Sequence, residues 1–73
     1  MDMEVGEFVI HRTDAKTPEM LMRVVGHGVD DMVGTVYHHH REWKDNSDPR
    51  GIWWNRPDAL LDPLQFGIVT PNV

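Results

Sequence analysis

Met32–Trp43, with the sequence MVGTVYHHHREW, is the stretch that decides the predicted fold. It contains no proline, and its only glycine lies near its start. Its middle, Thr35-Val36-Tyr37, combines β-branched and aromatic side chains, which fit the pleated, half-buried surface of a sheet. We therefore predict that Met32–Trp43 is the long central strand of a small antiparallel sheet.

Shorter apolar segments on both sides supply the partners that such a strand needs. Turn residues separate them: Gly26 and Gly28 are free to take positive φ and end the second strand. A single helical turn is expected over Arg56–Leu61, because Pro57 suits a helix start and Pro63 ends it. The remaining predicted strands are Val5–Arg12, Met20–Val25, Ile52–Asn55 and a closing strand at Leu64–Val69.

Length and composition bound the class of protein. The chain has 73 residues, which we interpret as one domain, and it has no cysteine to form disulfides or thiolate zinc sites. No apolar run reaches the length of a membrane span, and the N-terminus is acidic, unlike a signal peptide. We expect a soluble, cytoplasmic monomer with flexible ends at about residues 1–4 and 70–73 and a mobile loop at about 44–51.

Short motifs along the chain carry a resemblance to a known family. They are Val5-Gly6-Glu7-x-Val9, Pro18-Glu19-Met20, the strand ending at Trp43, and Pro57-x-x-Leu60. In this order they resemble the small SH3-like barrel proteins of bacteria and phages. The resemblance spans roughly residues 5–61 and implies an all-β fold, an antiparallel SH3-like barrel or curled sheet of four to five strands with one short helical turn. It implies little about function, since small barrels host many activities.

The charge is negative overall but unevenly distributed. Seven basic and twelve acidic residues give a net charge of −5, which disfavours general nucleic-acid binding. Residues 1–31 hold seven of the acids, whereas residues 38–56 hold four basic residues and three histidines. The sequence is compatible with an acidic side and a mildly basic, aromatic side, or with an ordinary solvated surface.

The histidine triplet at residues 38–40 suggests a metal site. On a strand, alternate side chains share a face, so His38 and His40 have the spacing of a two-ligand pair. A third ligand, from His11 or His27, is not fixed by any spacing. The competing interpretation is a polar strand end that titrates near neutral pH, and we expect no cofactor or structural metal.

Catalytic residues are scarce. Ser47 is the only serine and lies among turn formers, and Asp30 and Asp31 are adjacent rather than converging. A nucleophile needs an activating base, and acid–base catalysis needs groups that meet in a cleft. We therefore expect a protein that is not an enzyme.

Binding is the remaining function. Trp53 and Trp54 are adjacent, so on a strand they face opposite sides, and we expect one in the core and one exposed. Trp and Arg are the residue types that most often anchor protein interfaces. We predict a partner-binding surface that comprises Trp53, Trp54, Arg50, Arg56, Tyr37, His38 and His40.

Two function classes compete for this surface. The chain's size, acidity and lack of cysteine resemble those of phage-encoded proteins that bind bacterial RNA polymerase as inhibitors and antitermination factors. That resemblance implies a protein that docks on polymerase, hinders initiation and lets elongation pass terminators. The alternative is a nucleic-acid-contacting SH3-like domain, in which bases stack on aromatic side chains beside cations. Its contacts would come from Trp43, Trp54, Lys44, Arg50 and Arg56.

Overall fold

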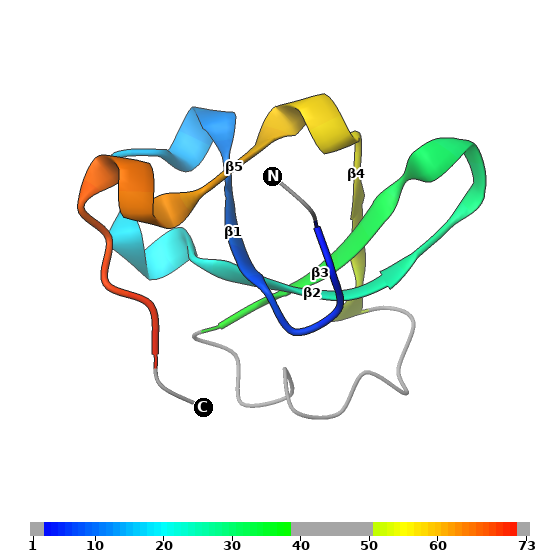
Figure 1. Cartoon of the computed structure of the whole chain (residues 1–73), viewed down its shortest axis with the longest axis horizontal. Helices are drawn as coiled ribbons and strands as arrows, with labels where there is room; N and C mark the ends of the chain where they lie inside the picture. The colour runs from blue at the N-terminus through cyan, green and yellow to red at the C-terminus, as the bar shows by residue number, and fades with distance from the viewer. Residues whose placement is uncertain (1–2, 39–50, 72–73) are drawn as a thin grey trace.

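The strands of this chain pair into one antiparallel sheet (Figure 1). The computed structural model describes residues 3–38 and 51–71. Its strands are β1 (Phe8–His11), β2 (Met22–His27), β3 (Val33–Tyr37), β4 (Trp53–Asn55) and β5 (Leu60–Leu61). Short 3₁₀ turns connect them: η1 (Arg12–Asp14), η2 (Pro18–Met20), η3 (Val29–Asp31), η6 (Pro57–Ala59) and η7 (Pro63–Phe66).

The strand order is β4-β3-β2-β1-β5, so the sheet is curled but not closed into a barrel. β4 and β5 are its two edges, and η6 connects them across the open side of the sheet (Figure 1). The predicted all-β class and the curled antiparallel sheet are confirmed. The barrel alternative is wrong, because β4 and β5 stand at opposite ends of the strand order. The helical turn predicted over Arg56–Leu61 forms as η6, and further 3₁₀ turns connect the other described strands. Within the described residues, no helix is long and apolar enough to cross a membrane.

β3 forms where the sequence predicts a strand, but the prediction that it is the central one is wrong, because β2 occupies the middle of the strand order and β3 lies between β2 and β4. Val33 to Val36 are all buried, which fits a strand covered on both faces. His38 follows β3 in a turn, and the rest of the predicted strand, residues 39–43, lies outside the described residues. The predicted mobile loop at 44–51 also lies outside them except for Gly51, as do residues 1–2 and 72–73 of the predicted flexible ends.

The turn between β2 and β3 differs from the prediction. Positive φ occurs at Asp30 (55°) and Asp31 (61°), not at Gly26 or Gly28. Two consecutive left-handed residues form a type I′ turn, whose twist matches that of the flanking strands. The backbone N–H of Met32 donates to the carbonyl of Val29 at 3.0 Å and closes this hairpin.

The predicted closing strand at Leu64–Val69 is wrong. The strand that pairs with β1 is Leu60–Leu61, inside the stretch expected to be helical. The chain then turns into η7, because the Asp62 side chain accepts a hydrogen bond from the N–H of Leu64 at 3.0 Å. Gly67, at φ 73°, ends this turn in the left-handed conformation that glycine adopts readily.

Buried apolar side chains form two clusters. The first contains Val9, Met22, Val24, Val33 and Leu60, and the second contains Ile10, Leu21 and Ile68. Val9 and Ile10 are neighbours on β1 and both are fully buried, so β1 carries core on both faces. β1 is paired on both sides, by β2 and β5. β1 is therefore an inner strand of the sheet and not an edge strand.

Candidate binding surface on strand β4

Both tryptophans of β4 are exposed. Trp53 lies opposite Thr35 and Trp54 lies opposite Gly34, on opposite faces of the sheet. Their exposed fractions are 56% and 51%, so the prediction that one of them belongs to the core is wrong. The reason is the position of β4: it is an edge strand of three residues, with a neighbour on one side only.

Trp53 packs against Tyr37, a residue that the sequence analysis placed at the same surface. The two rings meet edge to face, with centroids 5.9 Å apart and planes inclined by 70°. Tyr37 is partly buried against the first core cluster. Burial raises the pKa of Tyr37 above its ordinary value, and the nearby carboxylate of Asp14 raises that pKa further. Trp53 therefore contacts the first core cluster through Tyr37, while more than half of its surface faces solvent.

Asn55 fixes β4 against β3. Its side-chain amide donates to the hydroxyl of Thr35 at 2.9 Å and lies 3.0 Å from the carbonyl oxygen of Trp53. Thr35 is fully buried, and its hydroxyl lies 3.2 Å from the sulfur of Met22 and 3.3 Å from that same carbonyl. These polar contacts hold the short strand in one register, so the two indoles are presented in fixed directions.

The indole of Trp54 lies close to the backbone of Gly28 and Gly34. A Cβ atom on Gly28 would come within 2.9 Å of its ring, and one on Gly34 within 3.0 Å. The two glycines therefore allow the indole to lie directly against the β2–β3 hairpin. Beside it is an open apolar groove of about 290 Å³, lined by Gly28, Val29, Met32 and Trp54.

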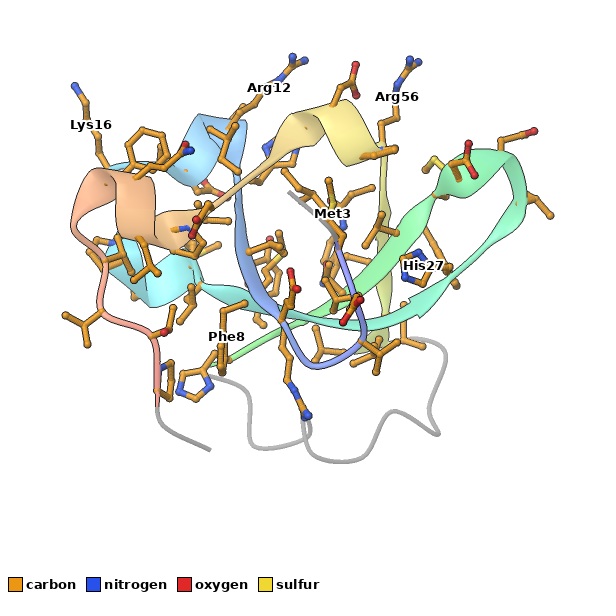
Figure 2. All side chains as sticks on the ribbon, in the orientation of Figure 1. Met3, Phe8, Arg12, Lys16, His27 and Arg56 are labelled. Atoms are coloured by element: carbon orange, nitrogen blue, oxygen red, sulfur yellow. The ribbon has the colours of Figure 1, made fainter. Side chains whose placement is uncertain are left out.

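Arg56 follows β4 and faces a second groove. Its Nε lies 3.4 Å from a carboxylate oxygen of Asp58, and both side chains are largely exposed. Figure 2 shows Arg56 pointing away from the sheet above β4. The groove has a volume of about 670 Å³ and is lined by Asp30, Asp31, Met32, Arg56, Pro57 and Asp58. The structure thus brings Arg56 next to acidic residues that the sequence analysis did not assign to the surface.

The other predicted surface residues divide into two groups. His38 lies at the end of β3, where its ring meets Phe8 edge to face at 5.7 Å, with planes inclined by 84°. Arg50 and His40 lie outside the described residues. In the part of the chain that the structure describes, no three His, Cys, Asp or Glu side chains come together as a metal site would require. The metal hypothesis for His38 and His40 therefore stays untested.

The residues around the groove beside Trp54 were not predicted from the sequence. Gly28 was predicted to be a turn residue, and no role was predicted for Gly34. A glycine inside a strand pattern often marks the close approach of another group, and that signal was present at Gly34. Val29 and Met32 carry no comparable signal, because their role depends on the turn at Asp30 and Asp31.

Comparison with known proteins adds no assignment to this geometry. No protein-family model matches the chain, and neither a curated protein nor a solved structure is similar to it.

Proposed function

We propose that this chain is a non-enzymatic protein-binding module that docks through the aromatic residues of β4. The observation that carries the proposal is the exposure of Trp53 and Trp54, at 56% and 51%, on one three-residue edge strand. Solvent exposure of two large aromatic side chains on one short strand is unfavourable in an isolated domain and typical of an interface. Tyr37 enlarges this aromatic surface through its contact with Trp53.

Two further features support a binding role. The Asn55–Thr35 contact holds β4 in place before any partner arrives, which lowers the entropy lost on binding. The chain also has few groups for covalent catalysis, with no cysteine and Ser47 as its only serine.

Bacterial RNA polymerase is the first partner to test, on the ground of the resemblance in size and composition to phage-encoded inhibitors of that enzyme. In this proposal the chain is phage-encoded, acts in the host cytoplasm, and inhibits initiation or permits antitermination. The aromatic surface of β4 contacts the polymerase, and Arg56 lies beside that contact.

The test is capture from bacterial lysate with the immobilised full chain, followed by identification of bound proteins by mass. The double variant Trp53→Ala/Trp54→Ala should lose the specific partner, whereas Phe66→Ala should retain it. Phe66 is a matched control because it is also an exposed aromatic residue, at 45%, on η7. Purified polymerase should then bind the wild-type chain and inhibit transcription in vitro. Equal capture by the double variant would place the docking surface elsewhere.

One observation favours a second candidate, contact with nucleic acid. Arg12, Lys16 and Arg56 all point away from the sheet at the same side of the molecule (Figure 2). Such cations, together with the exposed indole of Trp54, match the composition of single-strand binding surfaces. Binding to a single-stranded oligonucleotide that weakens steeply with added salt would support this candidate. The net charge of −5 speaks against it.

A further inference from the structure

We infer that the surface beside Trp54 accepts a partner segment in which an aliphatic side chain stands next to a lysine or arginine. This inference rests on the proposed protein-binding function and specifies the chemistry of the partner. It follows from two adjoining grooves, one apolar and one acidic, that share Met32.

The apolar groove offers contact area without polar competition. Its lining residues carry a single polar side-chain atom, the indole nitrogen of Trp54. Val29, at the end of the hairpin, is 81% exposed, and Trp54 is 51% exposed. An aliphatic side chain placed between them would remove apolar surface of all three groups from water.

The acidic groove begins where the apolar groove ends. Asp30 and Asp31 form the hairpin turn, and Asp58 lies on η6 across from them. Three carboxylates and the one guanidinium of Arg56 give this groove a net charge of −2. Because Arg56 lies 3.4 Å from Asp58, the two carboxylates of the turn dominate the field at the tip.

Lysine and arginine fit both grooves at once. Each has an apolar stem that packs along hydrophobic surface and a cationic head that remains in contact with carboxylates or water. A cation near the face of the Trp54 indole gains a further attraction from the ring. A phosphate backbone would face carboxylates at the same place, so the charge favours a basic peptide over a nucleic acid. Figure 1 shows why the site is compact: β4 and the β2–β3 hairpin lie at the same end of the molecule.

The experiment is a selection from a random-peptide phage-display library on the immobilised full chain, followed by affinity measurement with the selected peptides made synthetically. The expected result is enrichment of peptides that contain Lys or Arg beside an aliphatic residue. Their affinity should fall about tenfold or more in Trp54→Ala, as for a central interface residue. Phe66→Ala, on η7 at the other end of the molecule, should bind as the wild type does.

The double variant Asp30→Asn/Asp31→Gly tests the acidic groove without disturbing the fold. Asn-Gly is the preferred pair for a type I′ turn, so this variant keeps the hairpin and removes both charges. We expect it to lose most of the affinity and most of the salt dependence. Thermal unfolding of each variant confirms that the domain is folded.

Four results would overturn the inference. The library could select acidic or uncharged peptides, or show no enrichment above the Trp54→Ala background. The selected peptides could bind Asp30→Asn/Asp31→Gly as tightly as the wild type. Finally, a single-stranded oligonucleotide that binds through Trp54 could displace the peptides. Uncharged peptides that still depend on Trp54 would leave the proposed protein-binding function standing. Equal capture of the lysate partner by the wild type and by Trp53→Ala/Trp54→Ala would instead contradict the proposed function, whichever peptides the library selects.

Discussion

The side-chain amide of Asn55 donates a hydrogen bond to the hydroxyl of Thr35 at 2.9 Å, between the edge strand β4 and its neighbour β3. The two residues lie on the same face of the sheet, two register positions apart, since Asn55 is opposite Val33 and Thr35 is opposite Trp53. Thr35 is fully buried. This contact adds a side-chain hydrogen bond to the backbone pairing that joins the three-residue strand β4 to β3.

Removing either partner should weaken the fold, and the effects should not add. Thr35→Val and Asn55→Ala are each expected to cost about 1 kcal/mol, the usual net value of a hydrogen bond. The double variant should cost less than the sum by about 0.5 kcal/mol or more, because the two side chains share one interaction. Urea denaturation of the four proteins measures this coupling. Strict additivity would mean that Asn55 stabilises β4 only through the backbone carbonyls of Val33 and Trp53.

Truncation of either tryptophan should be tolerated by the fold. Trp53→Ala and Trp54→Ala are each expected to cost about 2 kcal/mol, roughly half of the cost of removing a buried aromatic side chain, because half of each indole is already in water. Leu60→Ala, at a position 4% exposed, serves as the core reference and should cost at least as much despite its smaller side chain. Thermal or urea unfolding decides the comparison. A loss of unfolding free energy as large as that expected for a buried tryptophan would contradict the exposed positions of Trp53 and Trp54.

The two glycines that face each other across β2 and β3 should respond differently to alanine. Gly26 and Gly34 are register partners, but a Cβ on Gly26 meets nothing within 4 Å. A Cβ on Gly34 would lie 3.0 Å from Trp54 and 3.1 Å from Ile52. Gly34→Ala should therefore displace the indole and destabilise the domain, whereas Gly26→Ala should be close to neutral. Near-ultraviolet circular dichroism follows the indole, and urea denaturation follows stability. Identical behaviour of the two variants would rule out the close packing of Trp54.

The hairpin turn can be improved. Asp31 has φ 61°, a conformation that costs free energy for a residue with a side chain, and the second position of a type I′ turn favours glycine. Asp31→Gly should stabilise the domain by about 0.5 to 1 kcal/mol. Asp58→Gly removes the same charge from η6 without relieving a positive φ, so it should not stabilise to this extent. A comparison of thermal midpoints tests the difference, and a lower midpoint in Asp31→Gly would contradict the turn assignment.

Stability at alkaline pH should depend on Tyr37. Burial, and then the carboxylate of Asp14, raise the pKa of Tyr37 in the folded chain. In the unfolded chain a tyrosine loses its proton near pH 10, so above that pH the unfolded state binds fewer protons than the folded state. The contribution of Tyr37 is fully present below about pH 10 and is lost as the pH rises through the folded value. Urea midpoints measured up to about pH 12 should fall less steeply in Tyr37→Phe than in the wild type. Parallel curves for the two proteins would show that the folded and unfolded states titrate Tyr37 alike.

Local chemistry in the sequence determined which segments form strands. The β-branched and aromatic residues around Val36 predicted β3, and the apolar runs around Val9, Val24 and Trp53 predicted its partners. These assignments succeed because strand formation depends largely on side chains that suit a half-buried pleated surface. A break after the second strand was also predicted, but the residues with positive φ are Asp30 and Asp31 rather than Gly26 and Gly28.

Tertiary structure decided the burial of individual side chains and hence the binding surface. Alternation along a strand assigns Trp53 and Trp54 to opposite faces of the sheet. It does not reveal that Trp53 packs against Tyr37 at the edge of the core, or that Trp54 packs against the backbone of Gly28 and Gly34. Likewise, Leu60 and Leu61 form β5 because they pair with the side of β1 that faces away from β2. No local sequence pattern identifies this pairing. Burial is a property of all the elements that surround a residue, so it is fixed only when distant segments of the chain are brought together.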